Sequence, residues 1–202
     1  MITSLVNPDA GGNGGGSNLY ALLNVNYDYA SFTPVTASNT DIISAHFINE
    51  PTSNTSTKYL LGSAGSAYIN IRGTDGRLRL ADDAGLLSTF SSIAELLDGN
   101  QHYVEFRISP SGVALWVDNA LRSSVTNSPT AFTFDVIGAR SSSSGYTSNG
   151  SVFGVTLGNQ ASWAMASPSF TINTVDSIGS NNLTFVNAPV SPVESDFIGV
   201  TP

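Results

Sequence analysis

The stretch DGNQHYVEFRISPSGVALWVDNAL, residues 98–121, decides the fold of this chain. Polar and apolar residues alternate over residues 102–108 and again over 113–117, and this period of two is typical of strands that bury one face. Residues 109–112 and Asp118-Asn119 are turn sequences, and the second suits a type I′ turn. The stretch therefore predicts consecutive antiparallel strands, with Val104, Phe106 and Ile108 turned toward a core.

The same pattern continues on both sides of this stretch. Residues 67–72 and 77–80 alternate around an Asp-Gly turn, which predicts another hairpin. Further strands are predicted over residues 41–48, 131–137, 150–157, 183–186 and 197–200. Ser92 and Glu95 have capping-box spacing, so residues 88–97 could hold a single helical turn, or residues 86–90 a strand. Many short strands without βαβ units predict an all-β fold, an antiparallel sandwich of jelly-roll type.

Composition narrows the classes of function. The chain has 202 residues, a net charge of −8 and a single lysine, Lys58, which argues against a partner that is a nucleic acid. It has no cysteine, so disulfides and thiolate chemistry are excluded. The N-terminus lacks a basic region and no apolar stretch approaches membrane-spanning length. We therefore expect neither a signal peptide nor membrane insertion.

The first residues differ from the rest of the chain. Residues 7–17 are rich in glycine, which predicts a flexible arm over residues 1–26 and a single sandwich domain over 27–202. Apolar residues flank the glycines and could dock on a neighbouring subunit or particle: Ile2, Leu5, Val6, Leu19, Tyr20, Leu22 and Leu23. The alternative is a disordered terminus.

The stretch 98–121 resembles the hairpin of laminin-G-like and concanavalin-A-like domains, with its Asp-Gly, its histidine and its Val-Asp-Asn-x-Leu ending. Residues 137–140 and 149–155 are similar to further pieces of that pattern. Residues 163–165 and 175–184 resemble the segment that usually opens such domains, yet here they follow the rest. Either the domain is circularly permuted, or another copy supplies its first strands.

The resemblance also bears on cofactors, because such domains often bind Ca²⁺ through an aspartate and loop carbonyls. No other cofactor is expected. The candidate ligands are Asp82 with Asp83, and Asp176 with Asn181. The alternative is that these residues are ordinary turn residues, since Asp and Asn favour turns for local reasons.

Catalysis is not expected. Glycosidases of this fold need two close carboxylates in a Glu-x-Asp-x-x-Glu pattern, and none of the four glutamates has that spacing. His46 and His102 each fall inside a predicted strand, and no Gly-x-Ser-x-Gly motif accompanies them. We therefore expect structural histidines and a protein that is not an enzyme.

The outward faces of the two hairpins offer candidate contact residues. Tyr103, Glu105, Arg107 and Trp116 should lie together on one hairpin, and Arg72, Arg77 and Arg79 on the outward side of the other. Aromatic rings beside arginine and glutamate suit sugar recognition, and the same residues are common in protein interfaces. The third alternative is a face covered by loops, without a binding role.

Two functions follow as expectations. The first is a structural protein of a virion, a capsid-decoration or tail component on the surface of a phage-like particle. It would contact other virion proteins and its own copies, with a trimer taken from particle symmetry. This expectation rests on a composition rich in Ser, Thr and Asn with few charges, and on the resemblance, since laminin-G-like domains are common on phage particles. The alternative is a carbohydrate-binding, lectin-like module for host glycans.

Overall fold

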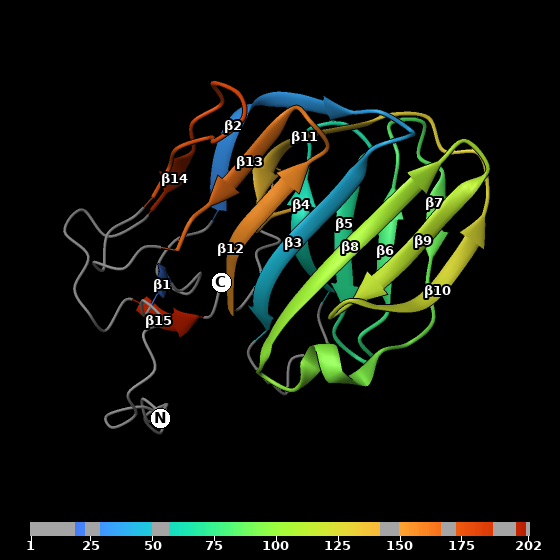
Figure 1. Ribbon diagram of the computed structural model, residues 1–202, viewed down its shortest axis with the longest axis horizontal. Helices are drawn as coiled ribbons and strands as arrows, with labels where there is room; N and C mark the ends of the chain where they lie inside the picture. The colour runs from blue at the N-terminus through green and yellow to red at the C-terminus, as the bar shows by residue number, and fades with distance from the viewer. Residues whose placement is uncertain are drawn as a thin grey trace.

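The computed structural model describes residues 19–22, 29–49, 57–141, 150–166, 173–187 and 197–200. Within them, two antiparallel sheets lie face to face (Figure 1). The six-stranded sheet has the order β10 (Ala120–Thr126), β9 (Gly112–Val117), β8 (Gln101–Ser109), β3 (Ile42–Asn49), β12 (Gly150–Leu157) and β13 (Ala161–Ala164). The seven-stranded sheet has the order β14 (Thr184–Val186), β2 (Tyr29–Ala37), β11 (Phe132–Ile137), β4 (Thr57–Gly62), β5 (Tyr68–Arg72), β6 (Leu78–Ala81) and β7 (Leu87–Thr89). The predicted all-β sandwich is confirmed.

The core lies between the sheets, where the predicted alternation places it. Val104, Phe106 and Ile108 of β8 are buried, and so are the inward residues of β5 and β6 in the opposite sheet. The rings of Phe106 and Phe90 lie 5.7 Å apart across this core. Burying one such large apolar side chain contributes about 1.5–3 kcal/mol, so these strands supply much of the stability.

The turn at the end of β9 has the predicted conformation. Asp118 and Asn119 have φ angles of 50° and 64°, as a type I′ turn requires at both central positions. The Tyr103 N–H donates to Asp118 Oδ1 at 2.8 Å, and the Asp118 N–H donates to the Tyr103 carbonyl at 2.9 Å. These bonds fix the turn against β8.

Residues 86–97, for which the sequence predicted either a strand or a single helical turn, contain both. Strand β7 is followed by a single 3₁₀ turn, η2 (Ala94–Leu97). The predicted capping box is wrong, because Ile93 is the N-cap residue and no side chain caps the helix. Ser92 lies one position too early, and its hydroxyl donates to Asp75 Oδ2 at 3.0 Å instead.

The C-terminal segment completes the sandwich of its own chain. Strand β13 pairs with β12 and β14 pairs with β2, so no second copy is needed to supply these strands. Strand β1 (Leu19–Leu22) pairs with β15 (Phe197–Val200), which brings Leu19, Tyr20 and Leu22 of the predicted arm into a two-stranded ribbon. The other predicted docking residues, Ile2, Leu5, Val6 and Leu23, lie outside the described residues. Among those described, no helix is long and apolar enough to cross a membrane.

Candidate functional site

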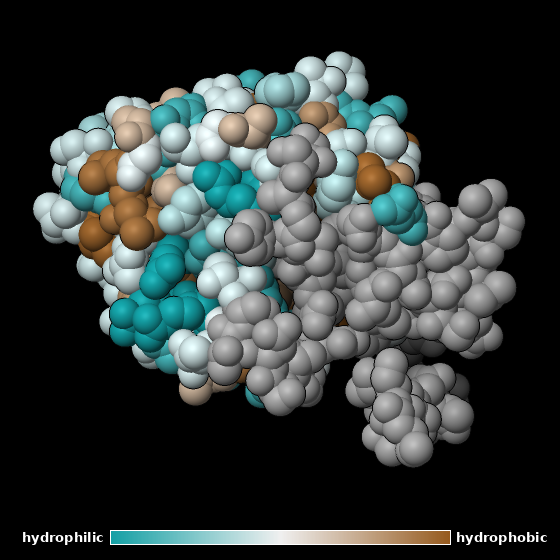
Figure 2. Space-filling view, turned by 180° about the vertical axis from the view of Figure 1, so that it is seen from behind, coloured by the Kyte–Doolittle hydropathy of each residue, from teal (hydrophilic) through white to brown (hydrophobic). Residues whose placement is uncertain are grey.

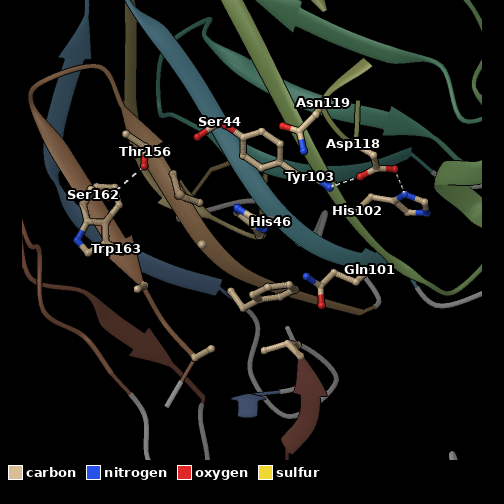
Figure 3. A pocket seen from close by; sticks show the side chains of 16 residues that line it. Ser44, His46, Gln101, His102, Tyr103, Asp118, Asn119, Thr156, Ser162 and Trp163 are labelled. Atoms are coloured by element: carbon tan, nitrogen blue, oxygen red, sulfur yellow. Dashed lines mark hydrogen bonds and ion pairs between the residues drawn. The ribbon is translucent and has the colours of Figure 1, made fainter. Parts of the chain in front are cut away.

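A groove lies on the outer face of the six-stranded sheet, the face turned away from the core. Its volume is about 690 Å³, within the range of small-molecule sites. Strands β3, β8, β12 and β13 form its floor, and the Asp118-Asn119 turn lies at one end (Figure 3). At another end, Val200 of β15 packs against Phe153 and Ile48.

Three hydroxyl side chains line up across neighbouring strands of this floor. The register pairs Ser162 with Thr156, and Thr156 with Ser44, so all three lie on one face; we call them the hydroxyl row. The hydroxyl oxygens of Thr156 and Ser162 are 3.0 Å apart. A dashed line joins the two side chains in Figure 3. Each hydroxyl can donate one hydrogen bond and accept others, so the row can bind both donor and acceptor groups of a ligand.

The next row of residues across the same strands explains why the outer face of the six-stranded sheet is hollow. Here the register aligns Ala164 and Gly154 with His46 and Tyr103, two minimal side chains beside two rings. A Cβ at position 154 would lie 3.3 Å from the His46 ring, so this glycine makes room for the imidazole. The His46 ring centre is 4.5 Å from that of Tyr103 and 5.8 Å from that of Phe153. We call these three side chains the ring wall.

The electrostatics of the ring wall keep its histidine uncharged. Burial lowers the pKa of His46, and the negative charge of Asp118 offsets only part of this effect. His46 is therefore a neutral imidazole near pH 7, with one nitrogen that donates and one that accepts.

His102 has a different role from His46. Its side chain lies on the face of β8 that is turned toward the core. It is 6% exposed, with Nδ1 2.9 Å from Asp118 Oδ2 and Nε2 3.1 Å from Asp98 Oδ1. Burial lowers the pKa of His102, but the hydrogen bonds to Asp118 and Asp98 outweigh it and raise the pKa overall. The imidazole ties the turn before β8 to the turn after β9. This is the structural role predicted for both histidines, whereas His46 faces the groove.

The predicted group on the β8–β9 hairpin does lie together. The Tyr103 hydroxyl donates to Glu105 Oε2 at 2.8 Å, and Arg107 Nε donates to Glu105 Oε1. The Arg107 guanidinium carbon lies 4.0 Å from the centre of the Trp116 ring. One face of the indole is therefore covered by a cation, and Tyr103 is the member of this group that lines the groove.

The three arginines of the other hairpin lie on the opposite outer face, that of the seven-stranded sheet. Figure 2 shows the molecule from behind, turned by 180° from Figure 1. Hydrophilic residues in teal and hydrophobic residues in brown lie side by side on the face that it shows. Arg72 makes two hydrogen bonds to Asp75, one of them 2.9 Å long from Nε, and Arg77 Nη2 is 3.7 Å from the same carboxylate. The bond from Arg72 holds the pKa of Asp75 far below its usual range. Arg72, Arg77 and Arg79 thus form no common surface with Tyr103, Glu105, Arg107 and Trp116.

The predicted Ca²⁺ ligands of the β6–β7 loop bind the protein's own N–H and O–H groups. Asp82 is 1% exposed; its Oδ1 accepts from the Leu86 N–H at 2.7 Å, and its Oδ2 from the N–H and hydroxyl of Thr130 at 2.8 and 2.9 Å. Asp83 accepts two bonds of 2.8 Å from Thr133. Both carboxylates fasten a loop to the start of β11, which favours the alternative of turn residues.

The second predicted pair has the same arrangement. Asp176 accepts from the N–H groups of Ser162, Ile178 and Asn181. Burial raises the pKa of Asp176, but the hydrogen bonds from these N–H groups lower it by more. The net shift is downward, so the carboxyl is ionised. The Asn181 carbonyl accepts from Trp163 Nε1 at 2.8 Å. In the described part of the chain, no group of three or more His, Cys, Asp or Glu side chains is placed to hold a metal.

Comparison with known proteins shows the fold alone. No protein-family model and no curated protein matches the chain. Among solved structures, a native heptameric SAP-like pentraxin from Limulus polyphemus aligns with a TM-score of 0.57 at 12% identity, over 92% of this chain and 95% of that one. A putative carbohydrate binding protein from Bacteroides ovatus aligns with a TM-score of 0.57 at 13% identity, over 87% of this chain and 61% of that one.

Domains LG4-5 of the mouse laminin α1 chain align with a TM-score of 0.44 at 17% identity. That alignment covers 69% of this chain and 40% of the laminin chain. The pentraxin and the Bacteroides protein thus share the two-sheet sandwich fold of this chain. This chain spans only part of the length of the laminin and Bacteroides chains.

Proposed function

We propose that this chain is a carbohydrate-binding domain without catalytic activity, whose ligand lies in the groove of the six-stranded sheet. One observation carries the proposal: the hydroxyl row lies directly beside a hollow bounded by the ring wall. Polar groups that fix orientation thus border an apolar depression, which is the usual arrangement of a small-molecule site.

The groove matches the chemistry of a sugar ring. A pyranose has hydroxyl groups around its edge and C–H groups on its faces. Ser44, Thr156 and Ser162 can bond the edge, while Tyr103 and the neutral His46 present ring surface to a face. Ala164 and Gly154 leave the space in which the sugar ring would lie.

The carboxylates near the groove support binding rather than hydrolysis. Retaining and inverting glycosidases need one protonated carboxylic acid and one free carboxylate. Asp118 is held by His102, and Glu105 is held by Tyr103 and Arg107. Burial raises the pKa of Glu105, but its bonds to Arg107 and Tyr103 lower it overall, so it is ionised and a poor general acid.

The first experiment is a glycan array on the full chain, followed by calorimetry with the oligosaccharide bound best. Ala164→Trp should then fill the groove and weaken binding at least about tenfold. Ser124→Trp is the matched control, because Ser124 is also exposed but lies on edge strand β10 of the same sheet, outside the groove. Equal affinity in both variants, or no glycan bound by the native chain, contradicts the proposal.

The virion role stays a prediction from composition and resemblance. It is compatible with a sugar-binding groove, because a domain on a particle surface can bind host glycans. Contacts with virion proteins and with further copies of the chain belong to the same prediction.

A further inference from the structure

The single lysine of the chain is buried between the two sheets. Lys58 lies in β4 of the seven-stranded sheet and is 4% exposed, and Asn49 ends β3 of the six-stranded sheet and is 3% exposed. Lys58 Nζ donates to Asn49 Oδ1 at 2.5 Å. An amine and a carboxamide thus meet in a site from which bulk water is excluded.

The carboxamide is held in one orientation. Asn49 Nδ2 donates to the Leu96 carbonyl at 2.9 Å, so the carbonyl side of the amide is turned toward Lys58. The uncharged amine is the nucleophile, so the lysine ammonium gives up a proton as it attacks. Proximity in a fixed geometry removes much of the entropic barrier to a reaction between two groups.

We propose that Lys58 and Asn49 form an intramolecular isopeptide bond. Lys58 Nζ attacks Asn49 Cγ, a new C–N bond forms, and the bond from Cγ to Nδ2 breaks. The leaving nitrogen departs as ammonium and takes with it the proton that the lysine ammonium gives up. Atoms and charge balance without an oxidant or other co-reactant, and the product is one secondary amide between β3 and β4.

The bond would join the two layers of the sandwich covalently. It would also replace a buried ammonium by a neutral amide, which removes the cost of keeping a charge in the interior. The proposal is independent of carbohydrate binding, because neither residue lines the groove.

The test is the intact mass of the purified full chain, combined with amine labelling after denaturation. The linked chain weighs less than the sequence mass by one ammonia, about 17 Da. Because Lys58 is the only lysine, an amine-reactive ester should label the unfolded linked chain as often as it labels Lys58→Arg, which has no lysine amine. An unlinked chain takes one label more than that variant.

The two readouts separate the bond from other losses of ammonia. A succinimide at another asparagine also lowers the mass, but it leaves Lys58 reactive and persists in Lys58→Arg. That result, or a native chain of full mass with a reactive lysine, overturns the proposal. The mass comes from the native chain and the labelling follows denaturation, so the conclusion holds even where Lys58→Arg prevents folding.

Discussion

The imidazole of His102 lies between two carboxylates, with Nδ1 2.9 Å from Asp118 and Nε2 3.1 Å from Asp98. Since the pKa of His102 is raised in the folded chain, its protonated form stabilises the fold. This contribution is fully present below the unfolded pKa, near 6.5, and is lost as pH rises through the folded pKa. We expect His102→Gln to cost about 1.5–3 kcal/mol at about pH 5.5, and clearly less at about pH 8.5. Urea unfolding at both pH values measures this, and a pH-independent cost contradicts it.

The two histidines should titrate on opposite sides of the ordinary histidine pKa. Burial dominates at His46 and lowers its pKa, whereas the two aspartates raise that of His102. Two-dimensional NMR of the imidazole protons across the acidic range should show His102 losing its proton at the higher pH. Asp118→Asn is the discriminating variant, because it should bring the two midpoints closer together. Coinciding midpoints in the native chain would exclude the arrangement described.

Asp82 should matter for stability and not for metal binding. Asp82→Ala leaves the N–H groups of Leu86 and Thr130 without this acceptor, and we expect a loss of about 2–4 kcal/mol. Because its oxygens already bind N–H and O–H groups, Ca²⁺ or a chelator should leave the melting temperature of the native chain unchanged. A clear rise with Ca²⁺ that disappears in Asp82→Ala would restore the predicted metal site.

The docking prediction for the N-terminal residues can be tested without disturbing the ribbon. A chain that begins at Leu19 keeps β1 and its pairing with β15, but lacks Ile2, Leu5 and Val6. If those residues dock on a neighbour, light scattering should give an oligomer for the full chain and a monomer for the shortened one. Equal masses would remove the arm as a cause of assembly.

The β8–β9 hairpin was predictable because its alternation is unbroken and both of its turns carry their own signals. Strand β2 was missed because its burial does not alternate regularly, and the register of its partner β11 shifts between Phe134 and Val136. Strand β4 has a similar irregularity between Tyr59 and Leu61. Such irregularities depend on pairing with distant strands, which a local pattern does not contain.

The groove was harder to foresee than the fold. Ser44, Thr156 and Ser162 meet only because β3 pairs with β12 and β12 with β13. Gly154 was the one local signal, since a glycine inside a strand often marks a close approach of another group. Alternation also shows that Arg79 and Trp116 face outward, but it does not tell which sheet each belongs to.

The β1–β15 ribbon has a mechanical consequence. Leu19 pairs with Val200 and Leu22 with Phe197. The first residue of β1 and the last residue of β15 therefore lie at the same end of the ladder. A pulling force applied between residues 19 and 200 would separate the hydrogen-bonded pairs one after another, starting with Leu19 and Val200. The pairs would not all be loaded at once in shear. We therefore expect the ribbon to open under tension before the strands of the two main sheets separate.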